Sequence, residues 1–264
     1  MQSIFRTVVI VRAKSPYVAV VLVALLLAVA ASGCVSTGAK EKVLVVGTSA
    51  DFPPFEYKNA SNGQITGFDI DLIKLIAKKM GYDRVEIKDM DFDSLIPALQ
   101  AGKVDVVIAG MTITPEREKV VDFSIPYWEA DQAVLVRKGS GIKVSSVDDL
   151  KGKKIGVEKG TTGAIYVKKH LGNSSTIKEY PTYVAALEAL LNGQVDVVVL
   201  DSPVAKMFSK KYSVEIVYTI KTGEHYGIAV KKGNKELLDG INKALKEIMN
   251  SPEWDKLVEK YFGS

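Results

Sequence analysis

The chain has 264 residues, with 35 Lys and Arg against 31 Asp and Glu, and apolar residues make up 47% of it. This length suits one large or two modest domains, and the composition is ordinary for a globular protein. Removing the first 33 residues takes away three basic residues and leaves 32 against 31, which is not a nucleic-acid-binding composition.

The N-terminus has the pattern of an export signal. Arg6, Arg12 and Lys14 precede fifteen apolar residues from Tyr17 to Ala31, and small residues follow. This apolar run is shorter than the roughly 20 residues that a membrane-spanning helix needs. We therefore interpret residues 1–33 as a cleaved signal peptide, with an uncleaved membrane anchor as the alternative.

Cys34 is the only cysteine, so it has no partner for an internal disulfide. It follows Ala-Ser-Gly directly, which resembles a lipoprotein signal whose cysteine is lipidated and becomes the new N-terminus. Ala31 stands where such signals commonly have leucine, and a small residue near an ordinary cleavage site is the alternative reading. Residues 34–42 then form a short polar tether, and the globular part begins near Val43, outside the cytoplasmic membrane.

Strands and helices alternate over residues 43–128. A strand at 42–47, a helix at 67–81, the strand VEIKDM, the helix FDSLIPALQAG and a strand at 104–110 predict a doubly wound α/β unit. Asp69 and Asp93 are expected to cap the two helices, and Gly81 to follow the first of them. The run VDVVIAG is almost wholly apolar, which is typical of a parallel strand buried on both faces.

The same pattern restarts over residues 133–222. The strand KKIGV, the helix AIYVKKHL, the strand TIKEY, the helix YVAALEALLNG and the strand VDVVVL predict a second unit of the same kind. AGKVDVVIAG at 101–110 is nearly repeated as NGQVDVVVLD at 192–201. A last strand, GIAVKKGN, precedes one or two amphipathic helices that Ser251-Pro252 separates. Two similar lobes predict a cleft, with ligands beyond the carboxyl ends of the strands.

The segment AGMTITPER follows the repeated strand of the first unit. Pro115 suits the first position of a helix, which makes Thr114 its N-cap and puts Arg117 in the first turn. Free backbone N–H groups and a planar guanidinium together suit a carboxylate. The alternative is a surface arginine paired with Glu116 or Glu118.

The segment GTTG joins the first strand of the second unit to its helix. Thr161 and Thr162 can cap that helix while backbone N–H groups face a ligand. The segment lacks the lysine and the spacing of a phosphate loop. A simple capping turn is the alternative.

The segment LDSP ends the repeated strand of the second unit. If Pro203 stands at the first helical position, Ser202 is the N-cap, and the carboxylate of Asp201 is free to make other contacts. A desolvated carboxylate there needs a partner, and a ligand ammonium group is one. Local hydrogen bonding of Asp201 is the alternative.

Aromatic residues follow the first strand of the first unit. Phe52, Phe55 and Tyr57 flank a stiff Pro-Pro pair, and Phe92 begins a nearby helix. Such rings can stack on a ligand side chain at low entropic cost. Taken one at a time, each phenylalanine also fits a core.

The chain from about Val43 to Phe262 resembles the amino-acid-binding proteins of ABC importers, the polar-amino-acid branch of the solute-binding proteins. The resemblance lies in GTSADFPPFEY, GFDIDLIKLIAKKMG, DFDSLIPALQAGKVDVVIAGMTITPERE, VDFSIPYWEA, DLKGKKIGVEKGTTG and LNGQVDVVVLDSP, in family order. It implies a two-lobed periplasmic-binding-protein fold whose lobes close on a ligand around a hinge of two segments. The implied lobes are 43–128 with 227–264, and 132–222, with crossings near Glu129–Asp131 and His225–Tyr226.

The resemblance also implies roles for site residues. Arg117 would bind the α-carboxylate of an amino acid, with Thr112 and the backbone of Thr162. Asp201 would bind the α-ammonium group, with the carbonyl of Gly110. Two rings would flank the ligand side chain, those of Phe52 and Phe92.

The identity of the amino acid rests on two positions. Relatives that take Lys, Arg or ornithine often have an acidic residue where this chain has Ser49, and this departure argues against a simple copy of their side-chain pocket. Glu158 ends a strand at a position that faces the ligand in relatives, and it would suit a cationic side chain. Its alternative is a solvent-facing glutamate paired with Lys159 or Lys168. We expect a basic amino acid such as arginine or lysine, with glutamine next.

The expected partners are a free amino acid, a membrane permease with a cytoplasmic ATPase, and the membrane through a lipid on Cys34. We expect a monomer without cofactor, metal site or nucleic acid. A dehydratase-like enzyme on the same fold, acting on a small cyclic acid, is the alternative. Glu158, His225 and Asp201 are its candidate groups, but they offer no nucleophile–base pair. A sensory module that signals through a separate partner is a further alternative.

Overall fold

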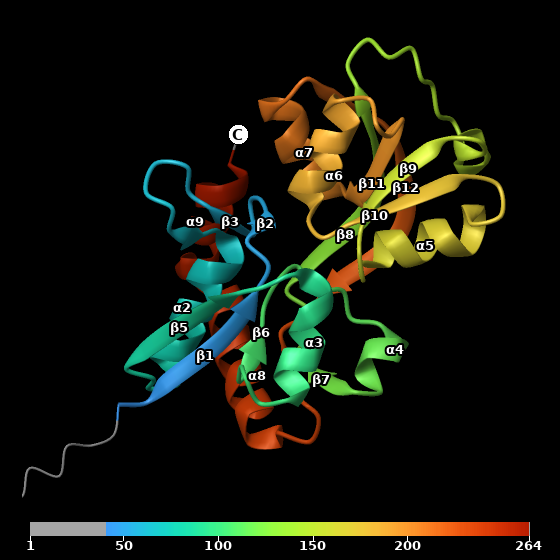
Figure 1. Ribbon diagram of the computed structural model, residues 1–264. Coiled ribbons are helices and arrows are strands. Elements are labelled where there is room, and N and C mark those ends of the chain that lie inside the picture. The colour runs from blue at the N-terminus through green and yellow to red at the C-terminus, as the bar shows by residue number, and fades with distance from the viewer. Residues whose placement is uncertain (1–40, 264) are drawn as a thin grey trace, which may run out of the picture. The chain divides into compact units, whose positions relative to one another are not determined.

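The computed structural model describes residues 41–263, so the predicted signal peptide, Cys34 and most of the predicted tether lie outside the described residues. Within this range the chain forms two lobes, each built on a five-stranded sheet (Figure 1). No helix in residues 41–263 is both long and apolar enough to cross a membrane.

The first sheet has the strand order β5-β1-β6-β13-β7. β1 pairs in parallel with β5 and β6, whereas β13 runs antiparallel to β6 and β7. A strand from late in the chain is therefore inserted between two early ones. The bounds are β1 Val43–Thr48, β5 Arg84–Asp89, β6 Val106–Val107, β7 Val121–Phe123 and β13 Ala229–Lys231.

The second sheet repeats this plan with the order β10-β9-β11-β8-β12. β9 is parallel to β10 and β11, and β8 is antiparallel to β11 and β12. The two-lobed α/β fold is thus confirmed, although both sheets are mixed. Only Val106–Val107 of the strand predicted at 104–110 has strand geometry. The bounds are β8 Trp128–Arg137, β9 Lys154–Glu158, β10 Thr176–Tyr180, β11 Val197–Asp201 and β12 Val214–Tyr226.

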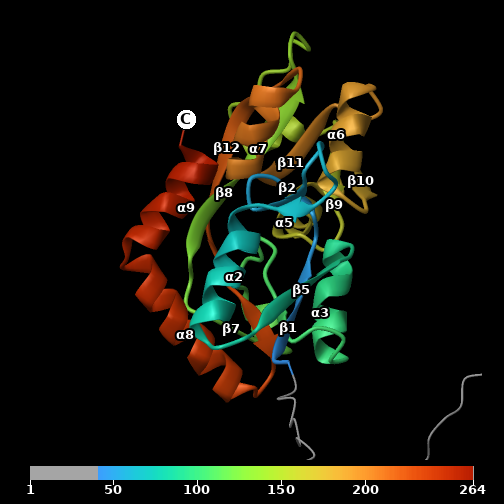
Figure 2. The ribbon, with the colours of Figure 1, turned by 90° about the vertical axis from the view of Figure 1, so that its left-hand side faces the viewer.

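Helices cover both sheets, and a small sheet of β2, β3 and β4 follows β1. α2 packs against α8 and α9, and Figure 2 shows these three helices along one side of the first lobe. Ser251 caps α9 and separates it from α8, as predicted. The remaining bounds are β2 Asp51–Phe52, β3 Glu56–Lys58, β4 Ile65–Thr66, α2 Phe68–Lys79, α3 Phe92–Gln100, α4 Pro115–Glu118, the 3-10 helix η1 Val147–Leu150, α5 Thr162–Leu171, α6 Tyr183–Leu191, α7 Ser202–Lys211, α8 Lys235–Met249 and α9 Pro252–Phe262.

The sequence repeat builds the same junction in each lobe. The carboxylate of Asp105 accepts a hydrogen bond from the backbone N–H of Val45 in β1, at 2.8 Å. The carboxylate of Asp196 accepts one from the backbone N–H of Lys154 in β9, at 2.7 Å. In each copy a glycine in the left-handed region follows the preceding helix. The repeat therefore ties β6 to β1 in the first lobe and β11 to β9 in the second.

β8 and β12 join the two lobes. They are antiparallel neighbours. At the end of the pair next to the first lobe, Glu129 pairs with His225 and Trp128 with Tyr226. Sequence reasoning identified neither strand. Their antiparallel pairing depends on segments about 90 residues apart, which local periodicity does not reveal.

Asp69 is not the N-cap of α2, because that helix begins at Phe68. Its carboxylate is fully buried and accepts hydrogen bonds from the backbone N–H of Gly110, at 2.8 Å, and from the hydroxyl of Tyr127, at 2.7 Å. Tertiary hydrogen bonds have thus replaced the predicted cap. The other end is as predicted, since Gly81 follows the helix with φ of 73°.

Two further cap predictions were wrong. α3 begins at Phe92, so Asp93 lies inside its first turn and pairs with Lys159 at 2.7 Å. α7 begins at Ser202, so Asp201 occupies the cap position, but its side chain makes no capping hydrogen bond. As predicted, the Asp201 carboxylate does not cap the helix, although Asp201 and not Ser202 occupies the cap position.

We expect Gly67→Ala to lower the free energy of unfolding by about 2–4 kcal/mol. Gly67 has φ of 138°, and a Cβ there would lie 2.0 Å from the carbonyl oxygen of Phe55. That contact is with backbone, so relief requires the chain to move. Urea unfolding of the variant measures the loss.

Gly63→Ala is the matched control, because Gly63 has φ of 69° but a Cβ would meet nothing within 4 Å. Its cost should be about 1 kcal/mol, from backbone strain alone. Equal losses for the two variants would contradict the steric account of Gly67.

Candidate functional site

All nine residues predicted to bind the ligand line one cavity between the lobes. The loops after β1 and β6, with α4 and the start of α3, form one wall; the loops after β9 and β11 form the other. These loops lie at the carboxyl ends of parallel strands. The nine are Ser49, Phe52, Phe92, Gly110, Thr112, Arg117, Glu158, Thr162 and Asp201.

Arg117 is positioned by the short helix α4. Thr114 caps this helix by accepting a hydrogen bond from the backbone N–H of Arg117, and Pro115 stands at its first position, as predicted. The guanidinium is 8% exposed and donates to the carbonyl oxygens of Thr112, at 2.7 Å, and Gly160, at 3.1 Å. Because Gly160 belongs to the second lobe, Arg117 bridges the lobes. The alternative of a surface arginine is excluded.

Asp201 ends β11 on the opposite wall. Its carboxylate accepts hydrogen bonds from the side-chain amide of Gln132, at 2.8 Å, and from the hydroxyl of Tyr226. Burial raises its pKa to about 7, and the nearby carboxylate of Glu224 adds to that shift. An approaching ammonium group would stabilise the ionised form.

Glu224, on β12, was missed by sequence reasoning. Its carboxylate accepts hydrogen bonds from the hydroxyls of Thr112, at 2.7 Å, and Thr162, at 2.6 Å, and from the amide of Gln132, at 2.9 Å. The two threonine hydroxyls come from different lobes. Glu224 therefore holds both lobes at the joining strand, and both hydroxyls donate to its carboxylate.

Glu158 is 1% exposed, and its Oε1 has no hydrogen-bond partner among the described residues. Lys159 pairs instead with Asp93, and Lys168 pairs with Glu179. The alternative of a solvent-facing glutamate paired with either lysine is therefore excluded. Burial raises the pKa of Glu158 well above its ordinary value, and neighbouring carboxylates add to the shift.

Two more acidic residues line the cavity, and sequence reasoning overlooked both. Asp51 accepts a hydrogen bond from the backbone N–H of Tyr183, at 2.6 Å, and burial raises its pKa to about 6. Glu56 is fully buried, and neither of its carboxylate oxygens has a partner among the described residues. Both lie in the segment SADFPPFEY, in which only Ser49 and the aromatic residues were predicted to contact the ligand.

Aromatic rings fill much of the cavity. Phe52 stacks on Tyr183 across the lobes, with ring centroids 5.7 Å apart. Gly110 lets the loop after β6 approach this ring, since a Cβ there would lie 2.4 Å from Phe52. The Cζ of Arg117 lies 5.2 Å from the ring centroid of Phe92, so this ring supports the guanidinium. Phe55, by contrast, is a fully buried core residue.

The cavity is nearly closed. Its volume is about 10 Å³, roughly the space that one water molecule needs. The Arg117–Gly160 and Tyr183–Asp51 hydrogen bonds and the Lys159–Asp93 ion pair all join the lobes. Any larger ligand therefore requires the lobes to separate first.

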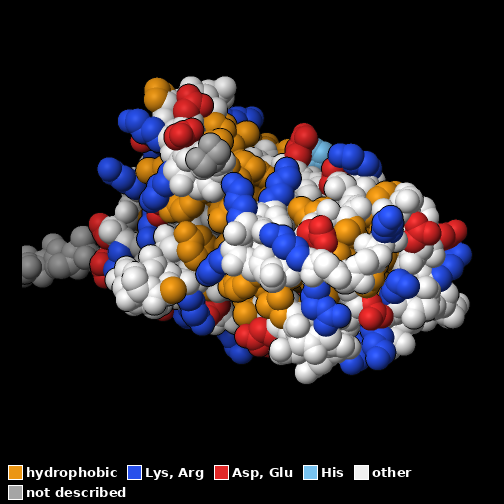
Figure 3. Space-filling model, turned by 90° about the horizontal axis from the view of Figure 1, so that it is seen from above, with side chains coloured by type: hydrophobic (Ala, Val, Ile, Leu, Met, Phe, Trp, Pro, Cys, Tyr) orange, Lys and Arg blue, Asp and Glu red, His pale blue; other side chains and the backbone are white. Residues whose placement is uncertain are grey.

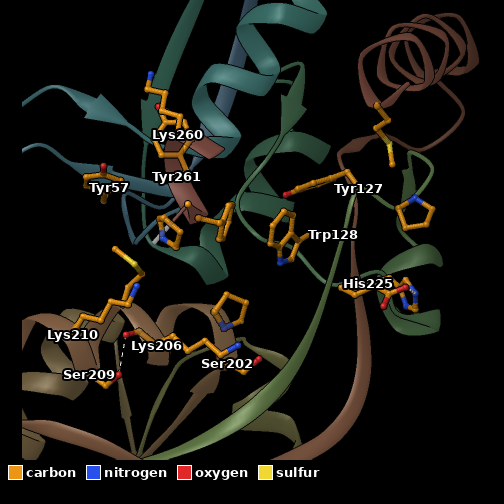
Figure 4. A pocket seen from close by; sticks show the side chains of 18 residues that line it. Tyr57, Tyr127, Trp128, Ser202, Lys206, Ser209, Lys210, His225, Lys260 and Tyr261 are labelled. Carbon is orange, nitrogen blue, oxygen red and sulfur yellow. Dashed lines mark hydrogen bonds and ion pairs between the residues drawn. The ribbon is translucent and has the colours of Figure 1, made fainter. Parts of the chain in front are cut away.

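A second, larger hollow of about 1080 Å³ lies beside the joining strands (Figure 4). Lys206 and Lys210 of α7 lie across it from Tyr57 and Tyr261, and Trp128 faces it from β8. Its charged side chains are exposed, so ion pairs there would contribute little. Figure 3 shows Lys, Arg, Asp and Glu interspersed over the face seen there, as on a solvated surface.

Residues 44–264 match the bacterial extracellular solute-binding proteins, family 3. The chain is 42% identical over 228 residues to a probable histidine-binding protein of Neisseria gonorrhoeae, covering 84% of each protein. It is 39% identical over 243 residues to the ABC transporter arginine-binding protein 1 of Escherichia coli (strain K12), covering 90% of this chain and 97% of that protein. The chain therefore belongs to family 3 of the bacterial extracellular solute-binding proteins.

Two similar solved structures are of an ancestral arginine-binding protein, one bound to arginine and one bound to glutamine. Each is 52% identical to this chain with a TM-score of 0.80, and the matches cover 83% and 84% of this chain and 98% of the ancestral chains. The resemblance drawn from the sequence motifs is thus confirmed.

Proposed function

We propose that this protein binds a free polar L-amino acid between its lobes and delivers it to the permease of an ABC transporter. A basic amino acid, arginine or lysine, is favoured, and glutamine is next. The observation that carries the proposal is the charge of the site. Among residues 41–263 Arg117 is the only buried cation, whereas four buried carboxyl groups line the cavity with it: Asp51, Glu56, Glu158 and Asp201.

Arg117 and Asp201 fit the two ends of a zwitterion. The guanidinium would bind the α-carboxylate, with backbone groups near Thr112 and Thr162, because the hydroxyls of both threonines are donated to Glu224. Asp201 would bind the α-ammonium group, with the carbonyl of Gly110. Hydrogen bonds to charged groups contribute roughly 1.5–3 kcal/mol each, which is compatible with micromolar binding after association costs.

The remaining carboxylates favour a cationic side chain. Asp51, Glu56 and Glu158 line the same cavity, and no basic side chain is paired with them in the described part of the chain. A buried carboxylate that keeps its charge needs a cation nearby. A ligand guanidinium or ammonium group would supply it, whereas glutamate would add another negative charge. Phe52 would lie against the aliphatic part of the side chain.

The wider setting is part of the same proposal. Residues 1–33 would be a signal peptide and 34–42 a tether with the lipid on Cys34, which would hold a monomer outside the cytoplasmic membrane. The lobes would be 43–128 with 227–264, and 132–222. The paired strands β8 and β12 support a hinge at the two crossings. The family and the named relatives support binding without turnover, in place of the dehydratase alternative.

Calorimetric titration with the twenty amino acids tests this function. The full chain, kept soluble in a mild detergent, should first be unfolded and refolded to remove any bound ligand. We expect arginine or lysine to bind most tightly, glutamine less tightly, and glutamate and aspartate not at all. Absence of binding by every amino acid would overturn the proposal, and turnover of a small cyclic acid would then favour the enzyme.

A further inference from the structure

We propose that Glu56 and Asp69 share a proton in the ligand-free site, and that the cationic side chain of the ligand displaces it. Binding of arginine or lysine would then release about one proton more than binding of an amino acid with an uncharged side chain. This inference rests on the proposed function, because it needs a cationic ligand in the cavity between the lobes.

The contact between the two carboxyl groups is the first argument. Glu56 on β3 and Asp69 on α2 are both fully buried, and the backbone N–H of Asp69 donates to the carbonyl oxygen of Phe55, the residue before Glu56, at 2.9 Å, which places the two carboxyl groups side by side. Both oxygens of Glu56 and the Oδ1 of Asp69 have no donor among residues 41–263. Two ionised carboxylates only accept hydrogen bonds, so this contact is a hydrogen bond only when one group is protonated.

The surroundings decide which group holds the proton. The Oδ2 of Asp69 accepts hydrogen bonds from the N–H of Gly110 and the hydroxyl of Tyr127, and both stabilise its charged form. Glu56 has no comparable donor, and burial raises its pKa well above the ordinary value. Glu56 is therefore the neutral acid, and its O–H donates to Asp69.

The charged groups that face Glu56 come from three other elements, and all are acidic. They are Asp69 on α2, Asp51 on β2 and Glu158 at the end of β9. Arg117 lines the same cavity, but its guanidinium donates to the carbonyl oxygens of Thr112 and Gly160 and forms no ion pair with Glu56. A ligand cation that enters beside Glu56 would thus be the first cation paired with it.

Charge balance then couples binding to pH. When a guanidinium or ammonium group enters, the O–H bond of Glu56 breaks, the proton goes to solvent, and the carboxylate pairs with the ligand. Arginine affinity should rise up to about tenfold per pH unit while Glu56 is still protonated in the ligand-free protein. Citrulline has the shape of arginine without the side-chain charge, so its affinity should lack this contribution and should depend less steeply on pH.

Calorimetry in two buffers measures the released proton directly. The full chain is titrated with arginine and with citrulline at pH 7, in phosphate and in Tris, whose ionisation enthalpies differ. We expect the enthalpy difference between the buffers to be larger for arginine than for citrulline by at least the amount for about one proton, because the α-ammonium group of either ligand displaces the same part of the Asp201 proton. Equal buffer differences for arginine and citrulline would overturn the proton exchange at Glu56 and leave the proposed function intact. If arginine does not bind at all, the proposed function fails first.

Glu56→Gln imitates the protonated acid, because an amide N–H can donate to Asp69. Proton release on arginine binding should fall by about one proton in this variant, and arginine should bind more weakly with a smaller dependence on pH. Glu215→Gln is the matched control, since Glu215 is exposed on β12, and it should release as many protons as the native chain. An undiminished release in Glu56→Gln would assign the proton to another group.

Carbon-13 NMR of the glutamate side chains gives a second measurement that needs no variant. In the native chain at pH 7 the Glu56 carboxyl carbon should show the shift of a neutral acid without ligand and of a carboxylate with arginine. An ionised Glu56 in both states would contradict the inference, even if Glu56→Gln does not fold.

Discussion

Arg117→Ala is expected to weaken amino-acid binding by at least about a hundredfold. The guanidinium is buried between the lobes and would make two hydrogen bonds to the ligand α-carboxylate, each worth roughly 1.5–3 kcal/mol. A loss of about 2.7 kcal/mol already corresponds to a hundredfold change in Kd. Calorimetric titration with the best ligand of the native chain measures the effect.

Two control variants separate the causes. Arg117→Lys keeps the charge but loses the planar fork, so its affinity should fall between those of the native and alanine chains. Arg84→Ala removes an exposed arginine that pairs with Glu41 at 3.0 Å, and it should bind like the native chain. If Arg117→Ala bound within about threefold of the native chain, the α-carboxylate would have to lie elsewhere.

Asp201→Asn is expected to weaken amino-acid binding by at least about thirtyfold while the ligand-free protein becomes no less stable. Asparagine has nearly the same shape and keeps an oxygen for Gln132 or Tyr226, but it no longer offers a charge to the α-ammonium group. Truncating one side of a buried charge pair costs about 2–5 kcal/mol. Titration should therefore show an affinity loss of at least about thirtyfold.

The stability part follows from the sign of the pKa shift. Burial raises the pKa of Asp201 from 3.8 to about 7, so the folded protein holds this proton more tightly than the unfolded chain. The ionised form therefore costs stability, and the cost grows as pH rises from about 4 to 7 and is constant above that. Asp201→Asn removes this cost. Its Tm without ligand should equal or exceed that of the native chain at pH 7, and the difference should shrink towards pH 4. A clearly lower Tm at pH 7 would contradict this.

Most regular elements could be predicted from the sequence, because they carry local signals. Helices α2, α3, α5 and α6 show helical spacing of apolar residues, and β1, β9 and β11 are short apolar runs next to turns. The joining strands β8 and β12 escaped prediction because they pair with distant segments. Asp69 has the residue type and position of a cap, but hydrogen bonds from Gly110 and Tyr127 hold it inside the fold.

Part of the site could be predicted because two of its residues stand next to local signals in the sequence. Asp201 ends β11 two residues before Pro203, and Arg117 follows Pro115 in the helix after the loop that leaves β6, and both are local signals that point to the cavity. Glu224 lies 107 residues after Arg117 along the chain, in a strand that sequence reasoning did not identify. Glu56 sits in an aromatic segment that resembles a core, and only its complete burial without a partner marks it as part of the site.

The most direct test of the central proposal is a crystal structure of the protein saturated with arginine. We expect electron density between the lobes, with the α-carboxylate on Arg117, the α-ammonium group on Asp201, and the guanidinium among Asp51, Glu56 and Glu158. Arginine bound in the reverse direction, or only in the outer hollow beside Trp128, would contradict the assignment of the site.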